Sequence, residues 1–185
     1  MPSAADAVIV AAWLVVLGDN LVLAAQGVRR ATDTRRYALG IALVVALVAA
    51  GVVLERASGG RLAASPVLGG LGMLAAAGGA LLHVSARRAI GAAWSTRPDE
   101  PTRLVEDGPY AIVRHPLYLG LALLGTGSMA AHPSLPTIAG GLGLLVGLTS
   151  KIVREERAMA STFGSRWEAY RRRVPPLIPR VRRRS

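Results

Sequence analysis

Five apolar segments, separated by polar stretches, fill most of the first 150 residues of the chain. The first three run from Ala7 to Val28, from Tyr37 to Leu54 and from Pro66 to Ala86, with about 18–22 residues each. A helix of that length crosses ~30 Å of hydrocarbon at 1.5 Å per residue. Since backbone amides find no water in lipid, these segments are predicted to be helices.

The last two apolar segments are shorter and almost adjacent. They run from Leu117 to Ala131 and from Leu135 to Ser150, and three residues, His132, Pro133 and Ser134, separate them. This spacing predicts a helical hairpin that is short for a full membrane crossing.

Beyond Ser150 the chain becomes polar, but apolar side chains recur at helical spacing. Four of them follow one another at intervals of four, four and three residues: Met159, Phe163, Trp167 and Tyr170. This stripe indicates an amphipathic helix that packs on the hairpin or lies at the membrane interface. Gly164 is expected to interrupt the helix, and Ser165 with Glu168 forms a capping-box pattern that would restart it.

Composition agrees with membrane helices and changes the interpretation of the charge. The chain is 52% hydrophobic and 18% charged, with 4% aromatics, and small residues such as Gly and Ala let helices in lipid approach closely. A net charge of +11 would alone suggest nucleic acid. However, 20 of the 22 Lys and Arg residues follow the first, third and fifth segments. The positive-inside rule then explains the charge without nucleic acid, with the N-terminus outside and the C-terminus cytoplasmic.

The predicted fold is an all-α integral membrane protein with about five transmembrane helices, a short C-terminal helical hairpin and a cytoplasmic amphipathic C-terminal helix. Residues 1–86 would form three transmembrane helices. Residues 87–185 would form a cytoplasmic connector, the hairpin, the C-terminal helix and a basic tail that lies against anionic lipid. Residues 1–6 contain no basic residue, so the first segment is interpreted as a span and not as a cleaved signal.

A few polar residues interrupt the apolar segments. Asp19, with Asn20, either marks a polar cavity or bonds a neighbouring helix. His83 and His132 are interpreted as structural, and the three scattered histidines predict no metal site. The absence of cysteine excludes disulfides and thiolate catalysis. Four glycines inside the apolar segments suit helix packing: Gly70, Gly72, Gly141 and Gly143. The pair Gly143 and Gly147 also permits a close helix contact within or between chains.

Two motifs in the polar parts of the C-terminal half carry chemistry. The first, R-H-P-x-Y-x-G, occupies residues 114–120 and follows the turn sequence Asp107-Gly-Pro-Tyr. Pro116 suits the first turn of a helix. The second, E-E-(x)6-F-G-x-x-W-x-x-Y-(x)3-V-P, occupies residues 155–175. In order and spacing, the two motifs resemble the isoprenylcysteine carboxyl methyltransferase family, with its phospholipid methyltransferase relatives, over about residues 94–179.

This resemblance implies an enzyme, an S-adenosylmethionine-dependent methyltransferase whose cofactor site lies within the membrane protein itself. Carried over by position, Lys151 would face the substrate and Arg114 would lie beside the reacting group as the catalytic residue. The cofactor contacts would fall on ten positions: Thr102, Arg103, Leu104, Val105, Tyr110, His115, Pro116, Leu117, Tyr118 and Glu155.

The residue types at these positions suit the implied chemistry. Glu155 can accept hydrogen bonds from the cofactor's ammonium group, and Tyr110 and Tyr118 offer aromatic faces to a cation. Methyl transfer to a carboxylate is an in-line displacement that needs no general base, because the nucleophile is ionised at pH 7. Catalysis would then come from positioning and desolvation. The expected partners are membrane lipids and an amphiphilic acceptor: a lipidated protein, an isoprenoid acid or a lipid-like small molecule.

Other interpretations stay open at this stage. A membrane reductase of the sterol-reductase type would use NADPH, and a non-catalytic membrane protein would keep the scaffold alone. Arg114 and His115 could be merely interfacial, and Glu155 with Glu156 could be a solvated face that pairs with neighbouring cations. The oligomeric state and the identity of the acceptor are not predicted.

Overall fold

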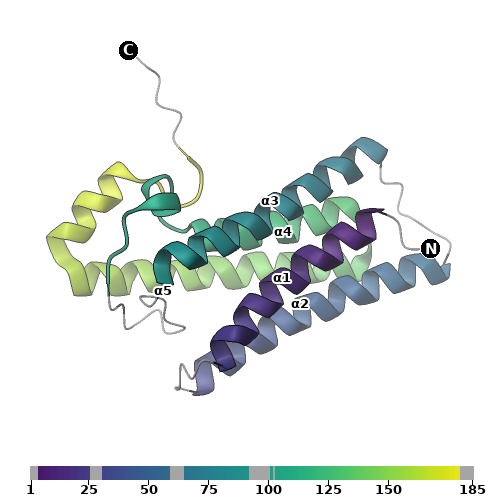
Figure 1. Ribbon diagram of the computed structural model, residues 1–185, viewed down its shortest axis with the longest axis horizontal. Helices are drawn as coiled ribbons and strands as arrows, with labels where there is room; N and C mark the ends of the chain where they lie inside the picture. Colours follow the sequence, from purple (N-terminus) through teal and green to yellow (C-terminus); the bar gives the residue numbers. More distant parts are fainter. Residues whose placement is uncertain (1–3, 26–30, 59–64, 92–100, 102, 180–185) are drawn as a thin grey trace, which may run out of the picture.

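The computed structural model describes residues 4–25, 31–58, 65–91, 101 and 103–179, and all regular elements in these ranges are helical. Their bounds are α1 (Ala4–Ala25), α2 (Ala31–Ser58), α3 (Pro66–Ile90), the 3₁₀ helix η2 (Gly108–Ala111), α4 (Pro116–Ala131) and α5 (Leu135–Arg173). The predicted all-α fold is therefore confirmed for the described residues. Figure 1 shows α3 and α4 side by side, with the first part of α5 running beside α4.

Helices α3 and α4 make the most extensive contact in the bundle, because glycines let their backbones meet. A Cβ added at Gly72 would lie 2.7 Å from the carbonyl oxygen of Gly127, and one at Gly79 would lie 2.7 Å from the amide nitrogen of Leu124. The packing role predicted for Gly72 is thus confirmed, whereas a Cβ at Gly70 would meet nothing within 4 Å.

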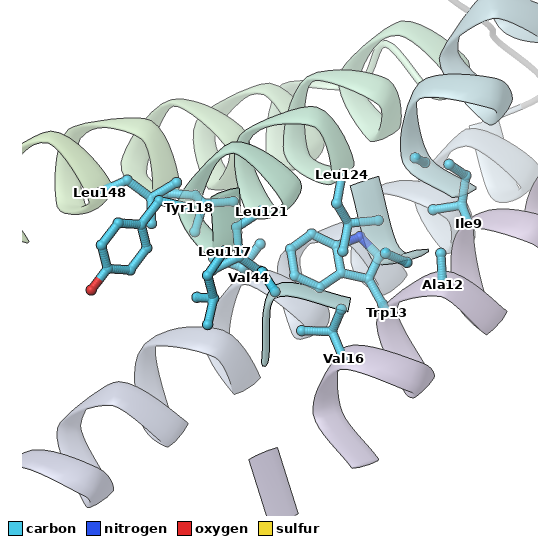
Figure 2. Packing of buried hydrophobic residues seen from close by; sticks show 14 of the residues in the cluster. Ile9, Ala12, Trp13, Val16, Val44, Leu117, Tyr118, Leu121, Leu124 and Leu148 are labelled. Atoms are coloured by element: carbon cyan, nitrogen blue, oxygen red, sulfur yellow. The ribbon is translucent and has the colours of Figure 1, made fainter. Parts of the chain in front are cut away.

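The other helices complete a core around α4. In Figure 2, Trp13 and Val16 of α1 and Leu121 and Leu124 of α4 point into one buried cluster. The indole Nε1 of Trp13 donates a hydrogen bond to Ser128 Oγ of α4 at 3.0 Å. Helix α2 packs chiefly against α5, so the N-terminal helices hold both members of the hairpin.

Local sequence signals explain where the helices begin. Pro66 and Pro116 stand in the first turns of α3 and α4, where a missing N–H costs nothing, and the Oγ of Ser65 accepts from the Leu68 amide. Ser134 caps α5 in the same way, because its Oγ accepts from the Thr137 amide. The predicted turn at 107–110 is the start of η2, where Gly108 takes a φ of 57°.

Helix α5 is longer than its apolar segment predicted. It continues from the hairpin through the charged residues after Ser150 and ends at Arg173. The only non-helical residue inside it is Gly164, whose φ of 50° and ψ of −123° kink the helix where the sequence predicted an interruption. The second helix of the hairpin and the C-terminal helix are therefore one bent element, and Figure 1 shows its yellow end turned back toward the start of α4.

Two helices of the described residues, α3 and α5, are long and apolar enough to cross a membrane. Helix α4, with 16 residues, spans about 24 Å, which is shorter than the ~30 Å hydrocarbon layer. Several of the basic residues on which the predicted orientation depends lie outside the described residues, namely Arg29, Arg30, Arg61, Arg97 and the run 180–184.

Candidate functional site

The two sequence motifs meet at the start of α4. The amide of Arg114 donates to the carbonyl oxygen of Pro175 at 2.8 Å, and the amide of His115 donates to that of Pro176 at 3.0 Å. The V-P end of the second motif therefore lies directly along the R-H start of the first. The kink at Gly164 makes this possible, because it turns the last part of α5 back toward α4.

The Arg114 side chain fixes this arrangement. Its Nη1 donates to the carbonyl oxygens of Val174 and Arg171 at 2.6 and 3.2 Å, and its Nε donates to Glu156 Oε1 at 3.0 Å. The guanidinium also lies over the Trp167 ring, 5.7 Å from its centroid. Arg114 is buried, so these contacts compensate the loss of water around its charge.

Glu156 joins both residues of the R-H pair. Its Oε1 accepts from Arg114 and lies 3.1 Å from His115 Nε2. The hydrogen bond from His115, together with the bonds and charge of Arg114, lowers the pKa of Glu156 to about 2 against its partial burial. Because of this low pKa, Glu156 is ionised at neutral pH. It lies in the charged half of α5, past the apolar residues, and its contacts with Arg114 and His115 make it part of the site rather than of a solvated face.

Glu155 lies on the other side of His115. Its Oε2 is 3.7 Å from His115 Nδ1, is buried, and accepts no hydrogen bond among the described residues. Burial raises the pKa of the Tyr110 phenol, and the carboxylate of Glu155 raises it further. A buried carboxylate oxygen without a donor suits a cationic hydrogen-bond donor supplied by a ligand, such as the ammonium of an amino acid.

The connector before α4 is held by the last turns of α5. Tyr170 Oη donates to the carbonyl oxygen of Tyr110 at 2.7 Å. Leu104 is buried with Trp167, Tyr170 and Val174, and Met159 and Phe163 pack against the same cluster. The predicted stripe on α5 therefore covers the connector.

A second pair of contacts leads from this site into the apolar part of the helix bundle. The rings of His115 and Tyr118 stack at 5.7 Å, and Lys151 Nζ lies 5.8 Å from the centroid of the Tyr118 ring. Lys151 also lines an apolar cavity of about 400 Å³ between α2, α4 and α5. That volume is within the range of small-molecule sites, ~300–1,000 Å³.

Asp19 faces the end of α3. Its Oδ2 lies 3.5 Å from Arg87 Nε and 3.9 Å from His83 Nε2, and His83 Nδ1 lies 3.4 Å from the carbonyl oxygen of Leu117. Of the two interpretations of Asp19, contact with a neighbouring helix is the one the structure agrees with. His132 similarly contacts Asp6, with Nε2 3.2 Å from a carboxylate oxygen.

The structure gathers most of the expected site residues around His115. Tyr118 and Glu155 lie beside it, Tyr110 lies close enough to Glu155 to feel its charge, and Lys151 is one ring further away. Leu104, Val105 and Leu117 are buried in the core clusters, and Pro116 is fully buried as well. Arg103 is exposed, and Thr102 lies outside the described residues.

Sequence reasoning did not assign Glu156 or the carbonyls of the C-terminal segment to the site. The signal available was charge complementarity, because each motif carries adjacent charges, R-H in one and E-E in the other.

The sequence of this region is similar to that of known proteins. Residues 72–161 match the isoprenylcysteine carboxyl methyltransferase (ICMT) family. Methanethiol S-methyltransferase 2 of Bradyrhizobium diazoefficiens is 45% identical over 80 residues, which are 41% of this chain and 29% of that protein. Protein-S-isoprenylcysteine O-methyltransferase of Schizosaccharomyces pombe is 40% identical over 80 residues, which are 41% of this chain and 34% of that protein.

A third relative matches over a longer stretch. The cobalt-zinc-cadmium resistance protein CzcN of Cupriavidus metallidurans is 31% identical over 160 residues, which are 84% of this chain and 70% of that protein. By contrast, the matched part of the chain corresponds to about a third of the length of each of the two methyltransferases.

Proposed function

Because this chain belongs to the isoprenylcysteine carboxyl methyltransferase family, we propose that it is a membrane-bound methyltransferase that uses S-adenosylmethionine. The observation that carries the proposal is the buried Oε2 of Glu155, which accepts no hydrogen bond among the described residues and lies beside His115. Two relatives named as methyltransferases support the reaction class.

The residues around Glu155 fit the cofactor's polar end. Glu155 would accept hydrogen bonds from the ammonium group, and His115 would bind the carboxylate or ribose. The faces of Tyr110 and Tyr118 would lie near the cationic centre. The cofactor supplies an electrophilic methyl group, and residues 103–115, held by Tyr170 and Arg114, keep these side chains in place.

We propose that the acceptor is amphiphilic and carries a carboxylate. Lys151 would hold the anionic head, and the apolar cavity that begins at Lys151 would hold the hydrocarbon part. The reaction is then an in-line displacement in which a carboxylate oxygen forms a bond to the methyl carbon while the methyl–sulfur bond breaks. No proton transfer is required, so positioning and exclusion of water by buried residues would supply the rate.

Arg114 stays a predicted catalytic residue beside the reacting group. Its charge would favour a carboxylate nearby, and its bonds to Glu156 and the C-terminal carbonyls would keep it from moving toward solvent. In this proposal Arg114 acts both on the acceptor and on the fold of the site.

The proposed membrane arrangement places about five helices across or partly across the bilayer, with the site at the cytoplasmic face. The hairpin tip at 132–134 and the N-terminus would then lie outside. The charged half of α5, from Lys151 onward, would lie inside, where Lys and Arg residues are enriched.

Calorimetric titration of the purified protein with S-adenosylhomocysteine tests the cofactor assignment. We expect saturable binding by the parent and loss of binding in Glu155→Ala. Glu168→Ala is the matched control, because Glu168 is on the same helix and pairs with Arg171 at the surface.

The same titration separates the alternative functions. A folded parent that binds NADPH and not S-adenosylhomocysteine would support the reductase. A folded parent that binds neither nucleotide would support a scaffold without catalysis.

A further inference from the structure

Glycines form one wall of the apolar cavity between α2, α4 and α5. Gly140, Gly143 and Gly147 of α5 lie on it at intervals of three and four residues, and Lys151 follows four residues later. These spacings place all four residues on one face of the helix, in a row about 16 Å long. The opposite wall includes Val44 of α2 and Leu121 of α4, which are buried.

The glycines of this row differ in what lies beside them. A Cβ at Gly140 would meet the Leu47 side chain at 3.1 Å, so this glycine packs against α2. A Cβ at Gly143 or Gly147 would meet nothing within 4 Å. The last two therefore do not serve a close helix contact within this chain, unlike Gly72 and Gly79, and their missing side chains keep the cavity open.

We propose that Gly143 and Gly147 set the length of the hydrocarbon chain that the acceptor can carry, with its anionic head at Lys151. This inference rests on the proposed function for its acceptor. Charge complementarity supports the orientation, because Lys151 is the only charged residue that lines the cavity in the described part of the chain, and its ammonium lies near Tyr118 and thus near His115. Both glycines are exposed at the groove, which gives a chain lateral access from the bilayer.

The two glycines lie at different distances from Lys151, so a side chain added at each should limit the acceptor to a different chain length. Gly147 is about one helical turn from Lys151, and Gly143 is about two turns away. A leucine at Gly147 would therefore block the groove close to the head, and a leucine at Gly143 would block it further along. The cut-off in chain length should be shorter for the first variant than for the second.

The test uses methyl, butyl and dodecyl thioethers of mercaptoacetic acid, with binding measured by calorimetry in lipid nanodiscs. We expect Gly143→Leu and Gly147→Leu each to weaken the dodecyl probe about tenfold, the usual cost of overpacking. The methyl probe should bind both as it binds the parent. The butyl probe should be weakened more by Gly147→Leu than by Gly143→Leu.

Three controls keep the outcome interpretable. Gly78→Leu makes the same substitution at an exposed glycine of α3 outside the cavity, where a Cβ meets nothing within 4 Å, and should leave all probes unchanged. Lys151→Gln should weaken all three probes by a similar factor, because it acts on the head. If a leucine variant fails to fold, the corresponding alanine variant should show the same order with a smaller effect.

Folded leucine variants that bind the dodecyl probe as the parent does would overturn the inference, as would a parent that binds no probe. Binding of S-adenosylhomocysteine, measured on the same samples, tests the proposed function separately. If the probes show the expected dependence on chain length but S-adenosylhomocysteine does not bind, the groove assignment would stand and the proposed methyltransferase function would be wrong.

Discussion

Arg114 and Glu156 form an ion pair in which both Nε and Nη2 of the arginine donate to the same carboxylate oxygen, Oε1. The pair joins the first residue of the R-H-P motif to the second glutamate of the E-E motif. Since Arg114 also donates to two backbone carbonyls of the C-terminal segment, this pair is the point at which α4, α5 and the end of the chain are tied together.

The two adjacent glutamates are predicted to have different roles. Glu156→Ala leaves a buried guanidinium without its anion, so we expect a loss of about 2 kcal/mol of unfolding free energy. Glu155→Ala removes an oxygen that has no protein donor, so we expect little change in stability and loss of nucleotide binding. Melting followed by Trp fluorescence and calorimetry distinguishes the two, and equal melting temperatures for both variants would contradict the assignment.

Arg114→Lys tests whether this residue does more than hold the fold. Lysine keeps the charge but cannot donate in the fork geometry of a guanidinium. We expect a lower melting temperature together with lower methylation. If the variant melts as the parent does and loses turnover without losing S-adenosylhomocysteine binding, Arg114 contacts the acceptor rather than acting through position.

The Glu156 contact also predicts a pH dependence of stability. Its pKa falls from an ordinary 4.5 to about 2 in the folded protein, so the ionised form is favoured by folding. The stability that this shift contributes is complete above about pH 4.5 and is lost as the pH falls toward 2. The difference in melting temperature between the parent and Glu156→Gln should therefore shrink as the pH falls from about 4.5 toward 2, and a difference that stays constant through that window would refute the assignment.

Adjacent glycines on α3 should respond in opposite directions to the same substitution. A Cβ at Gly79 would meet the backbone of α4, so we expect Gly79→Ala to cost about 1–3 kcal/mol. A Cβ at Gly78 meets nothing within 4 Å, so Gly78→Ala should be neutral or stabilising by up to about 1 kcal/mol. The test compares the melting temperatures of the two variants in the same detergent. Similar decreases in melting temperature for both would mean that α3 and α4 are not in backbone contact.

Sequence periodicity predicted the helices better than it predicted their tertiary roles. The start of α4 and the kink at Gly164 follow from local chemistry, namely a proline in a first turn and a glycine inside a polar helix. Both can be recognised without knowing what the helix packs against. A helix beyond Ser150 was predicted from the apolar stripe, but as a separate C-terminal helix, because the change from apolar to charged residues resembles the end of a helix.

The candidate site likewise contains residues that local motifs identified and contacts that only the tertiary structure shows. The motifs named His115 and Glu155, because they carry recognisable chemistry at a fixed spacing. The Arg114–Glu156 pair spans 42 residues and depends on how the kinked helix returns to α4, which no local pattern encodes. The different roles of Gly72 and Gly143, one in backbone contact and one in an open groove, likewise depend on neighbouring helices.

Membrane orientation can be tested directly, because the chain contains no cysteine and single cysteines can be introduced without background. Leu135 at the hairpin tip and Ile178 near the end of the described chain are 79% and 80% exposed, so substitution by cysteine should not disturb packing. In intact cells we expect a membrane-impermeant maleimide to label Leu135→Cys, and to label Ile178→Cys only after the membrane is permeabilised. The reverse pattern would invert the orientation and move the proposed site to the outer face. Labelling of both positions in intact cells would mean that α5 does not carry the chain across the membrane.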